Sequence, residues 1–473
     1  MACSDTESKG GAEDVVPLSD AAVATPGAVE APVAVDDVPD ASLQPDVVIV
    51  LENSLRADAE DRPFGEYAFV KGLGVMPSID YQWTYVQTVH SFVSLGSMLT
   101  GRYPSAIPLC SHPMGVAPQN APWCAQIPDT MPTIPEVLAL YGYDTVYATT
   151  QRRMTEHNQV AAQFQETLTV EMSGDQGLSS VVDSAIQWWG EHQDKPRFMV
   201  VHDSLEGALR SAAPPVHNQE IPTSVVGRIL TVYHQVAIRR GELLGRLLQH
   251  LKDNETQRPL WVIVTSGHGT NLGETSGTPS LPLQLTHHDI LLERTLHVPL
   301  VVFGPKSGHP KLQPSADTLV EPTIVELVDL MPTVTTLAQA ATPANLPGKD
   351  LLAQLDGNAN DGDSYAEFGD MLSLRSGQHL MMARLWMHGG TSMDPEITRR
   401  LKAAPNPGST FLLHEVVGDP MQVSELVEQE PDVARQMYER MIEVRVGPGS
   451  PPGGGLSNEQ VQALRNSGAL NYW

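Results

Sequence analysis

The chain has 473 residues, enough to bury a large core and to form one large α/β domain with a smaller one. Its formal net charge of -27 argues against nucleic acid or an anionic membrane surface as a partner, because both would repel it. The sequence has no apolar run of about eighteen residues or more, so it predicts no transmembrane segment.

Residues 1–44 are rich in Ala, Val, Pro, Asp and Glu and contain almost no aromatic residues. Such a composition cannot bury a core, so we expect a disordered acidic tether. The opening Met1-Ala2-Cys3 is similar to the lipid-attachment junction of a bacterial lipoprotein, although no signal sequence precedes it. Either the chain starts too late in its gene or Cys3 is an incidental free thiol, and we favour the first alternative.

A buried parallel strand is predicted over Val47–Leu51, where apolar residues run directly into Glu52, Asn53 and Ser54. Ligands of open α/β sheets bind at the carboxyl ends of the strands. A carboxylate, an amide and a hydroxyl at such an end indicate a site for a metal or an anion. Asp58, further along the same loop, is interpreted as a helix cap.

The next motif is a loop that enters a helix at Ser91–Thr100 and stops at Gly101. The free amides of a first helical turn favour an anion or a bound ester oxygen, but a serine before a helix is more often only its cap. Cys110 and Cys124 then bracket a Pro-rich insert without helix or strand periodicity. We predict a disulfide between them, and hence an oxidising location, over two unpaired thiols.

Helices and strands alternate through the middle of the chain, which predicts a mostly parallel sheet covered by helices on both faces. The expected elements are a helix at Thr133–Tyr141, a strand at Thr145–Thr149, a helix at Asp183–His192 with packed Trp188 and Trp189, a strand at Phe198–His202, a helix at Val225–Leu251 and a strand at Leu260–Val264. After Pro305, Pro- and Gly-rich loops separate a short helix at Val325–Ala338, a segment at Leu372–Trp386 and a helix at Pro431–Glu443.

Taken together with Trp261–Gly269 and Val298–Pro305, these segments resemble the sulfatases, the sulfate-ester branch of the alkaline phosphatase superfamily. The resemblance extends from about Pro45 to the end and keeps the order of the family, including Glu326–Val334 and Phe411–Leu426. It implies an alkaline-phosphatase-like α/β domain over residues 45–340. A small antiparallel subdomain over 341–446 would follow, and then a Pro/Gly linker and terminal segment over 447–473.

The resemblance also implies a site. It places the nucleophile of the family, a residue converted to formylglycine, on Ser91, and the carboxylate of the first strand on Asn53. The later metal-binding pair falls on Gly267 and His268, and a basic residue that contacts the sulfate falls on His287, beside His288. Calcium or magnesium is the implied metal, and an anionic ester or glycan is the implied substrate.

Several positions depart from the family pattern. Asn53 is neutral, Gly267 has no side chain, and Gly207 stands where a histidine is expected after His202. Val93 and Leu95 replace the Pro and Arg of the modification signature, so we do not expect formylglycine at Ser91. With two carboxylates lost we expect weak metal binding or none.

Glu52 could replace one lost carboxylate only if the loop started one residue early, because successive strand residues face opposite sides. We consider this the lesser possibility.

Three functions follow from this pattern. We expect a sulfatase-like pseudoenzyme that binds or scaffolds at a bacterial envelope, outside the cytoplasm and with a possible lipid anchor at Cys3. The alternative is an active metal-dependent hydrolase of sulfuric or phosphoric esters with Ser91 at the nucleophile position. A transferase of phosphoryl or phosphoethanolamine groups is a third possibility, and the lack of a membrane segment counts against it.

Overall fold

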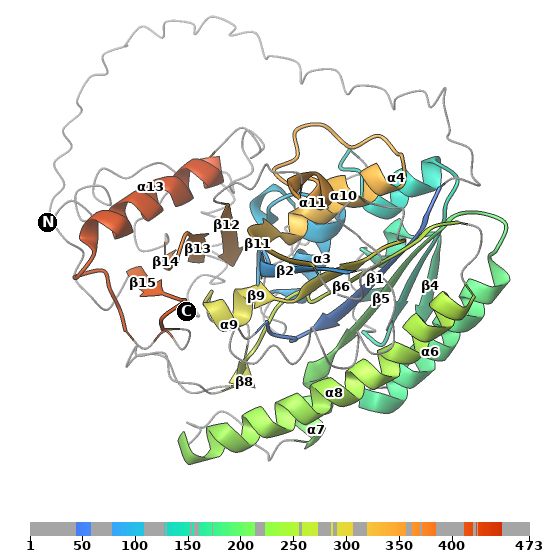
Figure 1. Cartoon of the computed structure of the whole chain (residues 1–473), viewed down its shortest axis with the longest axis horizontal. Helices are drawn as coiled ribbons and strands as arrows, with labels where there is room; N and C mark the ends of the chain where they lie inside the picture. Colours follow the sequence, from blue (N-terminus) through green and yellow to red (C-terminus); the bar gives the residue numbers. More distant parts are fainter. Residues whose placement is uncertain are drawn as a thin grey trace, which may run out of the picture. The chain divides into compact units, whose positions relative to one another are not determined.

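Strand β1 (Asp46–Asn53) lies inside a large mixed sheet (Figure 1). The computed structural model describes residues 44–57, 78–107, 127, 130–151, 154–155, 160–172, 174–212, 223–254, 258–272, 285–286, 291–305, 319–355, 362–368, 371–384, 411–419, 422 and 424–446. The three cysteines and Asp58 lie outside these residues, so the predictions made for them stay predictions.

The order of the large sheet is β11-β2-β10-β6-β1-β5-β3-β4, and β9 also pairs with β2. Strand β1 runs parallel to both of its neighbours, β5 and β6, while β10 and β9 are antiparallel. The other strands are β2 (Ser78–Tyr85), β3 (Asp144–Thr149), β4 (Glu166–Thr169), β5 (Arg197–Ser204), β6 (Leu260–Thr265), β9 (His297–Val298), β10 (Leu300–Phe303) and β11 (Leu319–Glu326). The predicted strands of the α/β region are therefore confirmed.

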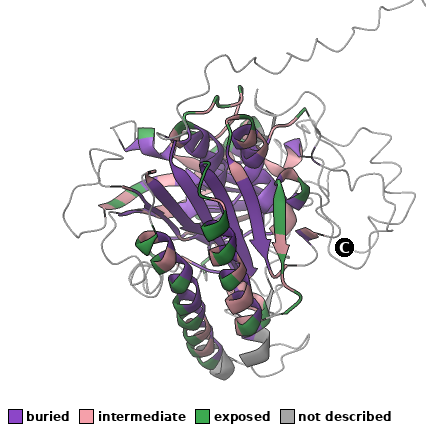
Figure 2. Ribbon diagram, turned by 90° about the vertical axis from the view of Figure 1, so that its right-hand side faces the viewer, coloured by how far each residue is buried: buried purple, intermediate pink, exposed green. Residues whose placement is uncertain are grey.

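Helices cover both faces of this sheet. One face packs under α6 (Gly174–Glu191) and α8 (Thr223–Asp253), which bury the even-numbered residues Val48 and Val50 of β1. The other face packs under α3 (Ser91–Thr100), α4 (Ile134–Leu140) and α10 (Leu330–Leu337), which bury the odd-numbered residues Val47, Ile49 and Leu51. In Figure 2 the central strands are buried, while the long helices expose their outward sides; the edge strand β4 is mostly exposed. The predicted α/β architecture is confirmed.

The helix ends follow the sequence. Thr133 and Glu136 form a capping box at the start of α4, and Gly101 ends α3 in the left-handed conformation, with φ of 66°. The expected helix at Val325–Ala338 is wrong at its start, because Val325 and Glu326 are the last residues of β11. Both tryptophans of α6 are buried as predicted.

A separate four-stranded antiparallel sheet contains β12 (Asp363–Phe368), β13 (Met371–Ser376), β14 (His379–Arg384) and β15 (Phe411–Glu415). Helix α13 (Pro431–Val446) packs on it and forms a third core. The small antiparallel sheet near the C-terminus is therefore confirmed. Short elements complete the described chain: η1 (Pro104–Ala106), η2 (Ala161–Gln163), η3 (Leu327–Asp329), α7 (Leu205–Ala212), α9 (Glu293–Leu296), α11 (Leu351–Gln354), β7 (Asn271–Leu272) and β8 (Leu285–Thr286).

Glu326 joins the two sheets at the end of β11. Its carboxylate accepts hydrogen bonds from the Tyr365 amide of β12 at 2.8 Å and from the Tyr103 hydroxyl at 2.8 Å. Burial, reinforced by the nearby Asp329, raises the pKa of Glu326 to about 7, and burial raises the pKa of Asp329 to about 6. Near pH 6 the folded protein therefore keeps protons on Glu326 and Asp329 to an extent that the unfolded chain, with ordinary carboxyl pKa values, does not.

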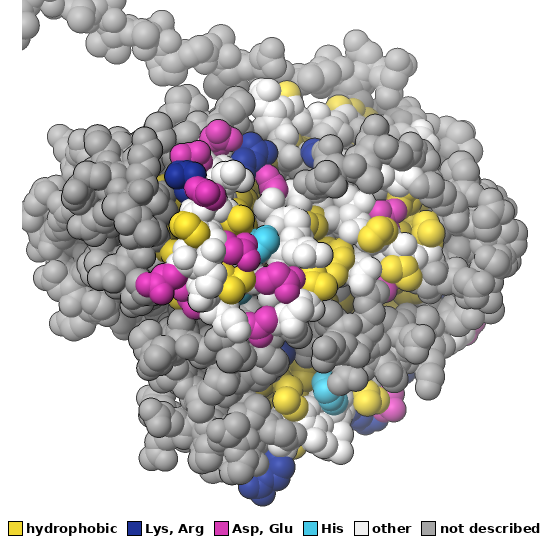
Figure 3. Space-filling model, turned by 60° about the vertical axis from the view of Figure 1, so that its left-hand side comes forward, with side chains coloured by type: hydrophobic (Ala, Val, Ile, Leu, Met, Phe, Trp, Pro, Cys, Tyr) yellow, Lys and Arg dark blue, Asp and Glu magenta, His cyan; other side chains and the backbone are white. Residues whose placement is uncertain are grey.

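The surface is acidic, as the net charge requires. In Figure 3, acidic side chains gather among hydrophobic ones on the face that comes forward from the left of Figure 1, where α13 is drawn. Among the described helices, none combines the length and the apolar character needed to cross a membrane.

We expect the free energy of unfolding to fall as the pH rises from about 5 to 8. A carboxyl group whose folded pKa is raised stabilises the protein below its unfolded pKa, and that contribution is lost as the pH passes the folded pKa. Glu326→Gln should flatten this decline by about 2–3 kcal/mol, measured by urea unfolding at each pH. Glu321→Gln, on the same strand, should leave the slope unchanged. An equal slope in wild type and Glu326→Gln would contradict the assignment.

Candidate active site

The loops after β1 and β6 are bound to each other at the carboxyl end of the sheet. Asn53 ends β1 with its side chain buried, and its Oδ1 accepts a hydrogen bond from the Gly267 amide at 3.1 Å. Ser54, with φ of 69°, donates its amide to the His268 carbonyl at 2.8 Å. A non-glycine residue at positive φ needs such surrounding contacts to hold it. These bonds fix the backbone that carries His268.

Ser91 and His268 are in direct contact. Ser91 is the first residue of α3 and is half-buried, whereas His268 is 1% exposed. The Ser91 Oγ lies 3.0 Å from the His268 Nε2, and the His268 Nδ1 lies 2.8 Å from the Gly269 carbonyl oxygen. Because a carbonyl oxygen can only accept, Nδ1 carries a proton, and in the neutral imidazole Nε2 is then an acceptor for the Ser91 hydroxyl.

Two close approaches explain why His268 lies between glycines. A Cβ on Gly267 would lie 2.5 Å from the Asn53 Oδ1, and a Cβ on Gly269 would lie 2.2 Å from the Arg294 carbonyl oxygen. Both distances are too short for a side chain. The family resemblance places a metal-binding aspartate at position 267. In this chain the side-chain amide of Asn53 occupies the space that a side chain at Gly267 would need.

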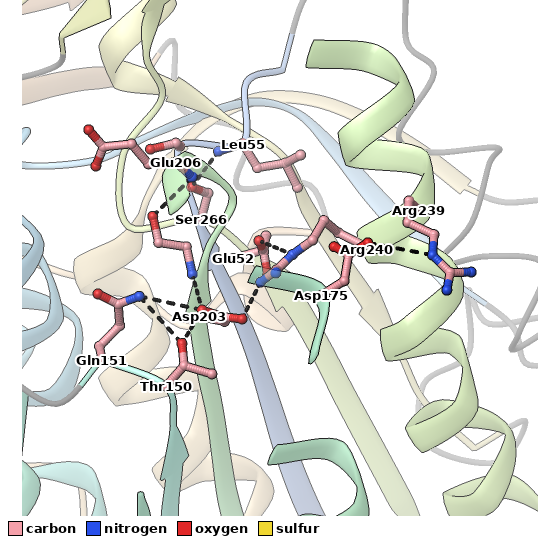
Figure 4. Close-up of polar contacts among 12 residues, drawn as sticks. Glu52, Leu55, Thr150, Gln151, Asp175, Asp203, Glu206, Arg239, Arg240 and Ser266 are labelled. Atoms are coloured by element: carbon pink, nitrogen blue, oxygen red, sulfur yellow. Dashed lines mark hydrogen bonds and ion pairs between the residues drawn. The ribbon is translucent and has the colours of Figure 1, made fainter. Parts of the chain in front are cut away.

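The carboxylate next to Asn53 points to the opposite face of the sheet. Glu52 is bound by Arg240 of α8, whose Nε lies 3.1 Å from the Glu52 Oε1, and the same guanidinium pairs with Asp203 of β5 (Figure 4). Asp203 also accepts hydrogen bonds from the Thr150 hydroxyl and the Ser204 amide. All three charged side chains of the ion pair are buried. Since β1 continues to Asn53, the early loop that would let Glu52 serve at the site is not formed.

One guanidinium cannot neutralise two buried carboxylates. Burial raises the pKa of Glu52 to about 7; Arg240 opposes this shift and the charge of Asp203 adds to it. The pKa of Arg240 is raised above its usual value by Glu52 and Asp203. Protonation of Glu52 would balance the charge of the cluster.

His202 is a neighbour of the site that the sequence interpretation left out. It pairs in register with Leu51, so it lies on the α3 face of the sheet. Its Nδ1 lies 2.5 Å from the Tyr147 hydroxyl, and burial, with the charge of the nearby His268, lowers the pKa of His202 to about 3. His202 is therefore neutral near pH 7. The position of His202 at the carboxyl end of a predicted strand is the sequence signal that could have identified it as a neighbour of the site.

The structure thus brings together three of the four residues expected in the site: Asn53, Ser91 and His268. Ser94, one turn further along α3, joins them by donating its hydroxyl to the Gly267 carbonyl at 2.6 Å. His287 and its neighbour His288 lie outside the described residues.

The donors in the described part of the site do not fit a calcium or magnesium ion. Such ions take several oxygen ligands, preferably carboxylates. Asn53 offers a neutral oxygen that the Gly267 amide already engages, and the carboxylates of Glu52 and Asp203, at the same ends of β1 and β5, are bound to Arg240. Across the residues that the structure describes, no cluster of three or more His, Cys, Asp or Glu side chains is arranged to hold a metal.

Solved structures share this fold. A phosphonate monoester hydrolase from Silicibacter pomeroyi superposes with a TM-score of 0.61 at 13% identity, over 88% of this chain and 98% of that one. A Bacteroides thetaiotaomicron sulfatase associated with the metabolism of multiple glycosaminoglycans gives 0.60 at 14% identity, over 89% and 99%. At such identities the likeness establishes the fold alone.

Sequence comparison defines the family. The sulfatase family model matches residues 45–340, more than half of the chain. The chain belongs to the sulfatase family. Arylsulfatase K of Xenopus laevis is 27% identical over 162 residues, which are 33% of this chain and 26% of that protein. The match thus spans about a quarter of the length of this relative.

Arg240→Met should lower the free energy of unfolding by about 3–5 kcal/mol at pH 8, because it leaves two buried carboxyl groups without a cation. The loss should be smaller at pH 5, where Glu52, with its raised pKa of about 7, is protonated. The matched control is Arg239→Met, since Arg239 is exposed and pairs with the exposed Glu242, and its loss should be within about 1 kcal/mol. Equal effects of the two substitutions would refute the role given to Arg240.

Gly267→Ala should cost about 1–3 kcal/mol, because the new methyl group displaces the Asn53 amide and breaks its bond to the Gly267 amide. In an Asn53→Ala background the same substitution should cost much less, giving a coupling that urea unfolding can measure. Gly207→Ala is the control, since Gly207 is an exposed helical residue with free space around it, and it should be neutral or stabilising. Additive costs for positions 53 and 267 would contradict the contact.

Proposed function

We propose that this chain is a sulfatase-family protein in which metal-dependent hydrolysis of sulfate esters is impaired, and that it binds an anionic ester or sulfated glycan. The observation that carries this proposal is the distribution of carboxylates. Glu52 and Asp203 are bound to Arg240 on one face of the sheet, and the α3 face presents Asn53 and Gly267 at the positions that the family resemblance assigns to metal ligands.

The first turn of α3 is the expected binding element. Helical geometry leaves the first amides of a helix without an intrahelical acceptor and favours negative charge at that end. Ser91, at the first position of the helix, is half-buried. A sulfate ester group could accept hydrogen bonds from this turn without a metal. The similarity to a sulfatase associated with glycosaminoglycan metabolism supports a glycan as the carrier of that ester.

An active hydrolase of sulfuric or phosphoric esters is the second candidate. It is supported by the 3.0 Å contact between the Ser91 Oγ and the His268 Nε2, because a nucleophilic hydroxyl needs a proton acceptor beside it. The family resemblance supplies calcium or magnesium for this reaction and His287 for the sulfate. A location outside the cytoplasm, with a lipid at Cys3, accompanies both candidates as a proposal.

Metal content and thermal melting of the purified full chain test the proposal. We expect less than stoichiometric calcium and magnesium by elemental mass spectrometry, and melting temperatures that agree within about 1 °C with excess ion or with EDTA, since a ligand raises stability only by binding the folded state. A sulfated glycosaminoglycan should raise the melting temperature, and its desulfated counterpart should not.

Turnover separates the two candidates. Under the first, aryl sulfates and aryl phosphates are not hydrolysed above background. Hydrolysis that stops with EDTA and with Ser91→Ala, together with near-stoichiometric metal, would overturn the first candidate and establish the second. Ser179→Ala changes a half-buried serine on α6 whose hydroxyl accepts a hydrogen bond from Arg246. It is the control for the loss of a hydroxyl elsewhere in the chain.

A further inference from the structure

The contact between Ser91 and His268 has the elements of an activated nucleophile. A serine hydroxyl becomes reactive when a base accepts its proton and a further group orients that base. Here the Nε2 of His268 is 3.0 Å from the Ser91 Oγ, and the Gly269 carbonyl, 2.8 Å from Nδ1, favours the tautomer in which Nε2 accepts from the Ser91 hydroxyl. The base is buried and the hydroxyl is half-buried, so a substrate reaches the nucleophile before it reaches the imidazole.

Among the residues that the structure describes, the polar groups bonded in this loop and helix start, those of Asn53, Ser94 and Gly267, carry no formal charge. The carboxylates of Glu52 and Asp203 lie on the other face of the sheet with Arg240. Sulfuryl and phosphoryl transfer need cations to offset charge on several nonbridging oxygens. Acyl transfer develops charge on one oxygen, which backbone amides can stabilise.

We propose that Ser91 and His268 form a metal-independent nucleophile that is acylated by uncharged carboxylic esters. This activity is of a different class from the proposed function and does not depend on it. Ser94 donates its amide to the His90 carbonyl at 2.8 Å, whereas helical geometry leaves the amides of Ser91, Phe92 and Val93 without an intrahelical acceptor. These first-turn amides are the donors available to the oxygen that becomes negative.

The reaction balances with water as its only co-reactant. The Ser91 Oγ bonds to the acyl carbon as its proton passes to the His268 Nε2. The bond to the alcohol then breaks, and the alcohol leaves with that proton. A water molecule attacks the acyl-Ser91 ester and gives its proton to Nε2. Release of the carboxylic acid returns the proton to Ser91.

A biotinylated fluorophosphonate tests the nucleophile on the full chain. The Ser91 Oγ should displace fluoride and form a stable phosphonyl ester, which intact mass and peptide mapping locate. Labelling should persist in EDTA, disappear in Ser91→Ala, and slow by about 100-fold or more in His268→Gln, as expected for loss of a general base. Ser179→Ala should label at the wild-type rate.

A second variant decides the outcome if His268→Gln does not fold, which thermal melting reveals. In Ser91→Cys the imidazole should hold a thiolate, so iodoacetamide should modify Cys at position 91 faster near pH 6 than it modifies an ordinary thiol, whose pKa is about 8.5.

No labelling of the wild type, labelling that needs calcium, or labelling unaffected by His268→Gln would overturn the proposal. Alkylation at position 91 with the pH dependence of an ordinary thiol would overturn it as well. Metal and glycan binding play no part in these readouts, so failure of the proposed function would leave this result intact, and the reverse holds too.

Discussion

The buried ion pair of Arg240 with Glu52 and Asp203 constrains the rest of the structure. It fixes helix α8 to the carboxyl ends of β1 and β5, where the two acidic side chains emerge from the sheet. Removing charges from water is costly, and the cost is met only while each carboxylate keeps its partner. The cluster therefore keeps both carboxylates on the α8 face of the sheet. A metal site on the α3 face would need carboxylates on that side.

Strand alternation turns this constraint into a difference between the two faces. Consecutive residues of β1 face opposite sides, so Glu52 lies with α8 and Asn53 lies with α3. The α8 face holds charge in a cluster closed to solvent. The described residues of the α3 face include an amide, hydroxyls and imidazole rings that hydrogen-bond to one another and to the backbone.

Backbone contacts, more than side chains, position His268. Its carbonyl accepts from the Ser54 amide, its Nδ1 faces the Gly269 carbonyl, and its flanking glycines leave no space for a Cβ. The imidazole is thereby held with one nitrogen toward Ser91. A single orientation of this kind is what a general base requires, and it arises from the same loop in which the family's metal-binding pair is expected.

The sequence by itself determined the fold class, because apolar runs such as Val47–Leu51 and the helical period of α8 depend only on local spacing. It also determined that Ser91, Asn53 and His268 follow strands or begin a helix at one end of the sheet. It did not determine where β11 ends, since Val325 and Glu326 suit a strand or a helix. Only the tertiary structure decided the partners of Glu52, the bond from Ser91 to His268 and the place of His202. These depend on contacts between residues far apart in the chain, whose geometry no local pattern encodes.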